Sequence, residues 1–258
     1  MIPKIIHYCW FGGKPLPQSV QKAIESWKKF LPDFEIKRWD ENNIDLNKCD
    51  YLKEAYEARK YAFMSDYVRF DVLYKYGGLY FDTDVELIKP IYDLIEKGPF
   101  MGLEKGTIQG LKRMQNGMFN FSHRIAPGLG LGAEPNMPIY KTIVEYYESM
   151  HFRKPNGSLN QTTTCLITTK LLTKKAVVIK DNYAIAEGVC IYPKDYFCPL
   201  NYLTRGLKIT PNTRSIHWYD SSWFPKPIIK FLKKLAKPIA TAWGQVGYQV
   251  LDAWKKAF

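Results

Sequence analysis

The hydrophobic positions of the first forty residues alternate between the period of a strand and the period of a helix. A β-branched and aromatic run over 4–10 ends at a Gly-Gly pair, which predicts a buried first strand followed by a loop. Over 16–32 the apolar residues recur every three or four positions until Pro32, as in an amphipathic helix. Residues 34–40 again alternate like a strand. This succession predicts an α/β fold with a largely parallel sheet.

A helical pattern over 51–76 leads directly into a short apolar run. We expect the helix to end at the Gly-Gly pair 77–78, because glycine adopts a positive φ at little cost. A strand over 79–87 follows, and its period of two places three carboxylates on one face: Asp82, Asp84 and Glu86. Ligands of open α/β sheets bind beyond the carboxyl ends of strands, so this strand end is the candidate site.

The pattern is weaker after Pro90. Residues 102–117 predict an irregular loop, and a glycine-rich run over 128–138 precedes a helix over 139–147. We do not expect the glycine run to cradle a phosphate, because no Lys-Ser/Thr pair follows it. Short strands are predicted at 175–181, 189–197 and 214–220.

Basic charge is concentrated at the C-terminal end. The formal net charge is +12, and residues 225–258 carry seven Lys against one Asp, which makes +6. Apolar residues in this segment recur at helical spacing between the lysines, so we predict a basic amphipathic helical appendage (225–258) behind a domain over 1–224. Such a helix suits an anionic membrane surface, and the alternatives are packing on its own domain or on a second copy in a homodimer.

The five cysteines are scattered and lack the close pairs of a zinc site, which favours free thiols in a reducing compartment. The first residues show no secretory signal, and no apolar run is long enough to span a bilayer. We therefore expect a cytoplasmic protein, attached peripherally to the inner face of the plasma membrane.

The carboxylates at 82 and 84 suit a hard divalent cation such as Mn²⁺ or Mg²⁺, which completes its shell with water and phosphate oxygens. Buried carboxylates are costly unless they are neutralised, which favours a metal over a polar strand end. Upstream, Asp66 and Arg69 stand three apart on one helical face. They form either an ordinary surface ion pair or part of the same cleft.

These residues belong to a longer ordered pattern. The stretch "SDYVRFDVLYKYGGLYFDTDVE" over 65–86 resembles the signature of the DXD-containing sugar transferases of glycosyltransferase family 32. That family includes bacterial capsular-polysaccharide transferases and initiating mannosyltransferases, and it is distantly similar to the glucosyltransferase domain of large clostridial toxins. The segment over 2–13 and the later segments 191–199 and 215–223 extend the resemblance.

The resemblance implies a GT-A fold with a mixed, largely parallel sheet and a metal-dependent hexosyltransferase that uses a nucleotide-sugar donor, with UDP-sugars favoured. The implied acceptor is a glycan or lipid-linked oligosaccharide in bacterial surface polysaccharide synthesis, and the implied stereochemistry is retention. Asp66 and Arg69 would hold the donor sugar and phosphate side, Asp82 would meet the ribose and a metal-bound water, and Asp84 would ligate the metal.

The other implied contacts surround this centre. Trp10 would stack on the base, and Ser65 and Tyr80 would line the nucleotide site. The Ser-x-Trp element would close over the diphosphate, with Ser221 near the metal, Ser222 beside it and the indole of Trp223 on a phosphate oxygen. His217 is placed where it could complete the metal shell.

Other interpretations remain open for several of these residues. Trp10 and His7 could be core residues, and Trp223 could anchor the C-terminal helices.

Two other classes of function were weighed. A metal-dependent phosphohydrolase would also use carboxylates, but such sites usually add several His and Asp ligands, and the chain has four histidines. A nucleic-acid-binding module would explain the charge, but no recognition motif is present, so we expect no nucleic acid partner.

Overall fold

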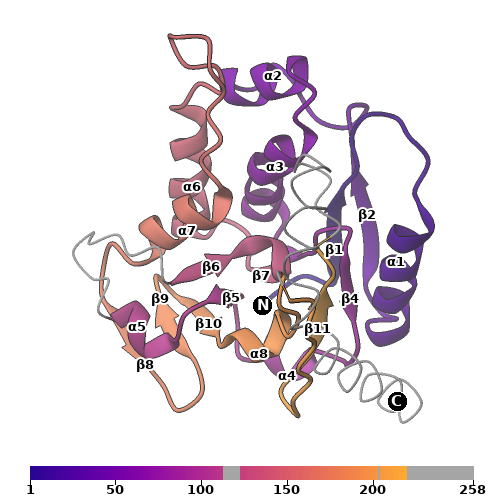
Figure 1. Ribbon diagram of the computed structural model, residues 1–258, viewed down its shortest axis with the longest axis vertical. Helices are drawn as coiled ribbons and strands as arrows, with labels where there is room; N and C mark the ends of the chain where they lie inside the picture. The colour runs from indigo at the N-terminus through magenta and orange to yellow at the C-terminus, as the bar shows by residue number, and fades with distance from the viewer. Residues whose placement is uncertain (113–122, 203, 220–258) are drawn as a thin grey trace.

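The computed structural model of the protein describes residues 1–112, 123–202 and 204–219 (Figure 1). Within them, a central mixed sheet has the strand order β2 (Glu35–Trp39), β1 (Ile5–Cys9), β3 (Gly78–Tyr80), β7 (Leu131–Ala133), β5 (Phe100–Lys105), β10 (Val189–Tyr192), β9 (Ala184–Ala186) and β8 (Val177–Ile179). Strand β6 (Arg124–Ala126) pairs with β5 beside this path.

Parallel and antiparallel pairs occupy different parts of the sheet. Strand β1 is parallel to β2 and β3, and β10 is parallel to β5, whereas β7, β6, β9 and β8 pair antiparallel with their neighbours. The α/β fold with a mixed sheet that the sequence predicts is therefore confirmed.

Helices cover both faces of the sheet. One core cluster contains the buried sides of α2 (Asp50–Glu57), α3 (Tyr61–Tyr76), α6 (Pro138–Glu148) and α7 (Thr164–Leu172). The other contains those of α1 (Gln18–Phe30), α4 (Tyr92–Ile95) and α8 (Lys194–Phe197). The short α5 (Ile108–Lys112) contacts β8.

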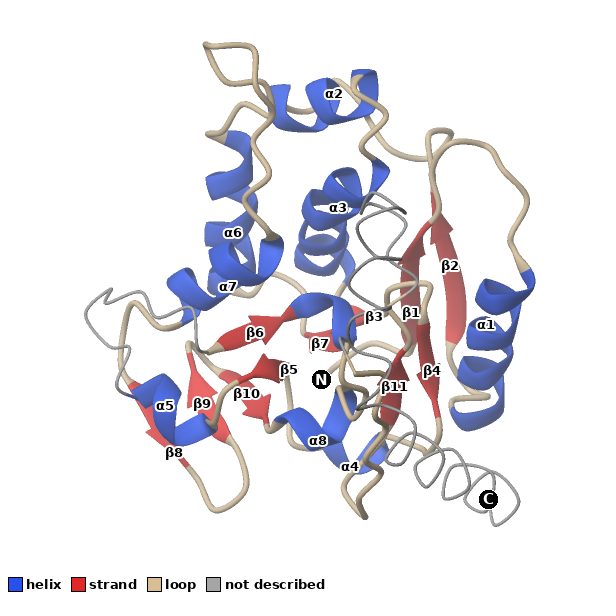
Figure 2. Ribbon diagram, in the orientation of Figure 1, coloured by secondary structure: helices blue, strands red, loops and turns tan. Residues whose placement is uncertain are grey.

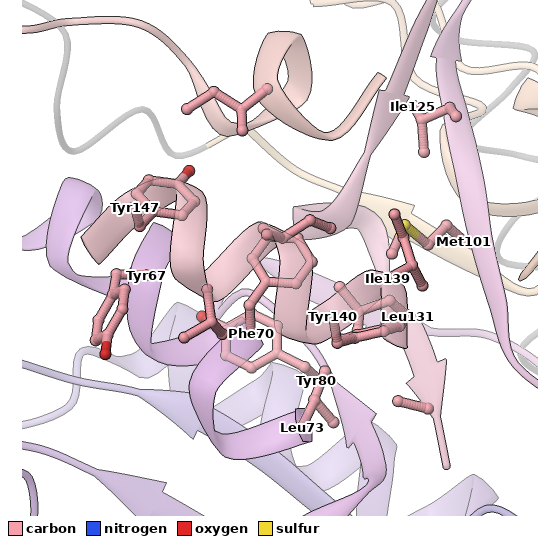
Figure 3. Close-up of a cluster of buried hydrophobic side chains, with 14 of the residues drawn as sticks. Tyr67, Phe70, Leu73, Tyr80, Met101, Ile125, Leu131, Ile139, Tyr140 and Tyr147 are labelled. Atoms are coloured by element: carbon pink, nitrogen blue, oxygen red, sulfur yellow. The ribbon is translucent and has the colours of Figure 1, made fainter. Parts of the chain in front are cut away.

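The period of the strands divides their side chains between these two cores. Leu79 and Phe81 join the core of α1, whereas Tyr80 joins the core of α3 and α6. Figure 3 shows Tyr80 beside Phe70 and Tyr140, where α3 and α6 pack on the sheet. Because α3 is fixed on one face of β3, its polar side chains are held beside the end of that strand.

A second, small sheet consists of β4 (Val85–Leu87) and β11 (Ser215–His217), which pair antiparallel (Figure 2). Helix α1 anchors β4 from the core side. The Trp27 indole donates a hydrogen bond of 2.8 Å to the Val85 carbonyl, and the Ser26 hydroxyl accepts one of 3.0 Å from the Leu87 N–H.

The prediction of one strand over 79–87 is wrong. The chain leaves the central sheet after Tyr80, turns, and enters the small sheet at Val85. Two hydrogen bonds shape this turn: the Val85 N–H donates to the Asp82 carbonyl (3.0 Å), and the Asp82 N–H donates to the Gly128 carbonyl (3.3 Å). The aspartates therefore lie in a turn between two sheets and are not on the face of a single strand.

Three further predictions need correction. The strand expected over 189–197 ends at Tyr192, and Lys194–Phe197 form helix α8. The helical pattern over 51–76 forms two helices, because the chain breaks at Arg59, whose φ is 53°. Residues 102–117 were expected to form a loop, but they contain the end of β5 and all of α5. The helix end at Gly77, with φ 63°, and the helix over 139–147 are confirmed.

No helix among the described residues is long and apolar enough to cross a membrane. The predicted appendage over 225–258 and its boundary at residue 224 lie outside the described residues.

Candidate functional site

Three side chains with metal-ligating atoms meet where the two sheets join. Asp82 and Asp84 come from the turn after β3, and His217 comes from the end of β11. The register of the small sheet pairs His217 with Val85, which brings the imidazole next to the turn. One ligand atom from each of the three residues lies within 4.8 Å of the others.

The imidazole of His217 is held through one nitrogen. Its Nε2 lies 3.0 Å from Asp84 Oδ1, and its Nδ1 is buried without a hydrogen-bond partner among the described residues. Burial lowers the pKa of His217, but the charges of Asp84 and Asp82 outweigh it and raise the pKa above its usual value. These two carboxylates therefore attract a positive charge to this position.

Arg69 joins helix α3 to the turn. Its Nη2 lies 2.8 Å from Asp66 Oδ1 and 3.3 Å from Asp82 Oδ1, and its side chain is only 4% exposed. Its Nε donates to the Ser65 carbonyl at 3.0 Å, and its guanidinium lies over the Tyr80 ring at 4.9 Å. A buried guanidinium is tolerated because it is paired with two carboxylates. The three-residue spacing of Asp66 and Arg69 thus forms part of this site.

Burial also perturbs the carboxyl groups. It raises the pKa of Asp66 to about 7, although the charge of Arg69 acts in the opposite direction. It likewise raises the pKa of Asp82, which Arg69 lowers and the charge of Asp84 raises further. The Tyr80 hydroxyl donates to Asp82 Oδ1 at 3.2 Å. Carboxyl groups crowded in this way are stabilised when a cation binds among them.

The end of β1 lies against the same region. The Cys9 thiol is near the Ser65 and Tyr80 hydroxyls, and the charges of Arg69 and Asp82 reach it. The next residue, Trp10, is partly buried against the core of α1, and its indole N–H donates to the Lys14 carbonyl at 2.6 Å. The Ser65 hydroxyl donates to the Tyr61 carbonyl at 3.1 Å.

Other residues named in the sequence analysis lie away from the cluster or outside the described residues. His7 is fully buried, with Nδ1 accepting from the Trp39 indole (3.0 Å) and Nε2 donating to the Gly77 carbonyl (2.9 Å), so it is a core residue. Glu86 accepts a hydrogen bond of 2.8 Å from the Trp218 indole in the small sheet. Three predicted site residues lie outside the described residues: Ser221, Ser222 and Trp223.

Two neighbours of the site were not predicted. Glu104, at the end of β5, lies 3.7 Å from the Arg124 Nε, accepts a long hydrogen bond of 3.4 Å from the Tyr219 hydroxyl, and raises the pKa of His217. It was missed because its segment was expected to be a loop. Gly128 lies against Asp82, and its only signal in the sequence was its place in a glycine-rich run.

The ligand atoms fit a divalent cation. Two carboxylates and the imidazole of His217 supply an oxygen-rich set with one nitrogen. Mg²⁺ favours oxygen ligands alone, whereas transition metals also accept imidazole, so this set matches Mn²⁺ better than Mg²⁺. Arg69 provides a second, fixed positive charge beside the cluster, and the combination suits a ligand with a diphosphate group.

Comparison with known proteins agrees with this chemistry. Residues 17–101 match the family model described as "Glycosyltransferase sugar-binding region containing DXD motif". An uncharacterized glycosyltransferase of Acanthamoeba polyphaga mimivirus is 29% identical over 165 residues, which cover 61% of this chain and 59% of the relative. Inositol phosphoceramide mannosyltransferase 3 of Schizosaccharomyces pombe is 38% identical over 88 residues, which cover 33% of this chain and 24% of the relative. The chain thus spans less than two thirds of either relative.

Solved structures show a more distant likeness. The PaToxG glycosyltransferase is 18% identical with a TM-score of 0.47, over 66% of this chain and 69% of that structure. The galactosyltransferase LgtC, in complex with donor and acceptor sugar analogues, is 17% identical with a TM-score of 0.45, over 90% of this chain and 95% of that structure.

Proposed function

We propose that this chain is a glycosyltransferase of the kind that contains a DXD motif, and that it transfers a sugar from a nucleotide diphosphate donor to a hydroxyl group of a glycan. The observation that carries the proposal is the meeting of Asp82, Asp84 and His217 next to the buried Arg69. With a divalent ion bound by these residues, the site would present both the ion and the Arg69 guanidinium to one diphosphate group.

The reaction makes two demands on the site. As the glycosidic bond to the diphosphate breaks, positive charge develops at the anomeric carbon and negative charge on the leaving phosphate. A bound Mn²⁺ or Mg²⁺ would stabilise the charge on the diphosphate oxygens. In this proposal Asp84 and His217 hold the ion directly, Asp82 holds it or its water, and Arg69 contributes positive charge that needs no reorganisation. Asp66 accepts a hydrogen bond from a hydroxyl of the donor sugar.

The nucleotide is proposed to lie at the end of β1. Trp10, which is only partly buried, would stack on the base, and Ser65 and Tyr80 lie near Cys9 at the adjacent end of the strand. Ser221, Ser222 and Trp223 are proposed to contact the diphosphate from the segment that follows β11. A UDP-sugar is the favoured donor, and transfer with retention is the favoured stereochemistry.

The acceptor is proposed to be a lipid-linked oligosaccharide of bacterial surface polysaccharide synthesis, such as capsule. The basic segment 225–258 supports this part of the proposal, because seven lysines within an apolar pattern favour the anionic inner face of a plasma membrane. A homodimer formed through the same segment is the alternative.

A panel of UDP- and GDP-sugars with Mn²⁺ tests the proposal. Thermal unfolding should shift upward with one donor and return to the unliganded value when EDTA is added, because only a bound ligand stabilises the fold. Nucleoside diphosphate should then be released faster when a glycan acceptor is present. Release of free sugar or phosphate without any acceptor preference would instead indicate a phosphohydrolase.

A further inference from the structure

We propose that Gly128, because it has no side chain, sets the position of the Asp82 carboxylate in the metal site, an inference that rests on the proposed function. Gly128 belongs to the short 3₁₀ turn η1 (Pro127–Leu129), outside the segment that matches the family model. Its carbonyl accepts the Asp82 N–H at 3.3 Å, so the two backbones are already in contact.

Side-chain atoms of Asp82 and Arg69 occupy the space next to the Gly128 Cα. A Cβ built at this position would lie 2.1 Å from Asp82 Oδ2, 3.1 Å from Asp82 Cγ and 3.3 Å from Arg69 Nη1. A distance of 2.1 Å is far inside van der Waals contact, which for carbon is about 3.5–4.0 Å. A methyl group at residue 128 therefore cannot coexist with the present position of the carboxylate.

The contacts of the Asp82 carboxylate oppose its movement away from such a methyl group. Its Oδ1 lies 3.2 Å from the Tyr80 hydroxyl and 3.3 Å from Arg69 Nη2, both of which are buried. Rotation of the carboxylate away from residue 128 would break one of these contacts or move an oxygen out of the cluster with Asp84 and His217.

The packing of turn η1 also opposes a shift of its backbone away from Asp82. Pro127, Gly128 and Leu129 are all buried, and Leu129 is part of the core of α1. A Cβ at Gly130, the residue that follows η1, would lie 2.9 Å from the Phe81 ring. The backbone after the turn is therefore also packed closely against Phe81, which precedes Asp82. A methyl group at residue 128 is thus expected to displace Asp82 and not the turn.

The backbone of Gly128 does not itself require glycine. Unlike Gly130, whose φ is 128°, Gly128 does not adopt a left-handed φ. Gly128→Ala therefore introduces a steric contact with Asp82 without backbone strain, and its effects report the position of that carboxylate.

The test measures binding of Mn²⁺ alone by calorimetry. Changes to residues that support metal ligands typically cost about 10- to 100-fold in affinity, and Gly128→Ala should weaken Mn²⁺ binding by this factor. The control is Gly102→Ala, whose Cβ would lie 2.7 Å from the Phe197 ring in the core, and which should keep the wild-type affinity even if its Tm is lower. If Gly128→Ala binds Mn²⁺ as tightly as the wild type, the inference is wrong, and the proposed function is not affected. A wild-type protein that binds no Mn²⁺ overturns the proposed function and the inference with it.

A second measurement, of Tm, tests whether the methyl group at residue 128 clashes with Asp82 or with other neighbours. In the Asp82→Ala background the methyl group has room, so Gly128→Ala should lower the Tm there by much less than in the wild type. An equal decrease in both backgrounds overturns the proposal. If Gly128→Ala does not fold, folding of the double variant supports the proposal, and failure of the double variant to fold overturns it.

Discussion

Asp84, in the turn that leads into β4, and His217, at the end of β11, lie 3.0 Å apart, Oδ1 to Nε2. The backbone reinforces this pairing, because the Trp218 N–H donates to the Asp84 carbonyl at 2.9 Å. The pairing of β11 with β4 and this hydrogen bond therefore bring the backbones of the two candidate ligands together.

Asp84→Asn should remove a charged ligand while keeping the size of the side chain. We expect turnover with the best donor to fall by about 100- to 1,000-fold, as when one electrostatic contact to a transition state is removed. Steady-state rates over a range of Mn²⁺ concentrations test this, and near-normal turnover at any of them would refute the metal assignment. Glu86→Gln is the matched control, since Gln can still accept the hydrogen bond from Trp218.

Arg69→Met should destabilise the fold as well as the site. It leaves Asp66 and Asp82 without their shared cation in a buried setting, and removing one partner of a buried pair costs about 3–5 kcal/mol. Urea unfolding measures the change. Lys75→Met, which breaks the partly exposed pair with Asp71, should cost no more than about 1 kcal/mol. Similar losses in the two variants would contradict the role given to Arg69.

His7 should make the fold sensitive to acid. Burial lowers its pKa from 6.5 to about 4, with the Gly77 carbonyl acting against this and Lys37 adding to it. Between these values the unfolded chain binds a proton that the native state does not, so stability falls as pH drops from about 6.5 to about 4. The full loss is about 3 kcal/mol.

Unfolding free energies of the wild type and His7→Gln at pH 7 and pH 5 isolate this effect, because Gln does not titrate. The variant should lose less stability on acidification than the wild type. His151→Gln should behave in the opposite way: hydrogen bonding to Glu54 raises the pKa of His151, so its contribution is present at low pH and is lost as pH rises. Identical pH slopes for the wild type and His7→Gln would contradict the prediction.

Trp10→Ala should raise the KM for the donor while leaving kcat nearly unchanged. Stacking of a base on an aromatic ring contributes about 1–3 kcal/mol, which corresponds to an increase of about fivefold or more. Trp10→Phe retains a ring and should recover most of the affinity. If Trp10→Ala binds the nucleotide as tightly as the wild type, Trp10 is not part of the nucleotide site.

The sequence was most informative where one local rule determined the structure. The helix end at Gly77 followed from the cost of a positive φ, and the proximity of Asp66 to Arg69 followed from helical spacing. The strand prediction over 79–87 was wrong because alternation alone cannot show that residues 78–80 and 85–87 pair with different partners. That choice depends on Val85 and Leu87 packing against α1 and on β11, which is distant in sequence.

The same limit applies to the site. Glu104 lies near His217, and Gly128 lies against Asp82, because of how the strands are arranged in the fold. The spacing of these residues in the sequence does not predict either contact. His217 was predicted through resemblance alone, and the antiparallel register with β4 supplies the physical reason for its position.

The origin of His217 in the last strand of the described chain has a consequence for biosynthesis. Because a chain is synthesised from its N-terminus, the strands of the central sheet and the helices of both layers are made before β11. Until β11 is made, the proposed metal site would contain Asp82 and Asp84 but lack its third candidate ligand, His217. Competence for the proposed sugar transfer would then depend on the pairing of β4 with β11, which is made after the strands of the central sheet.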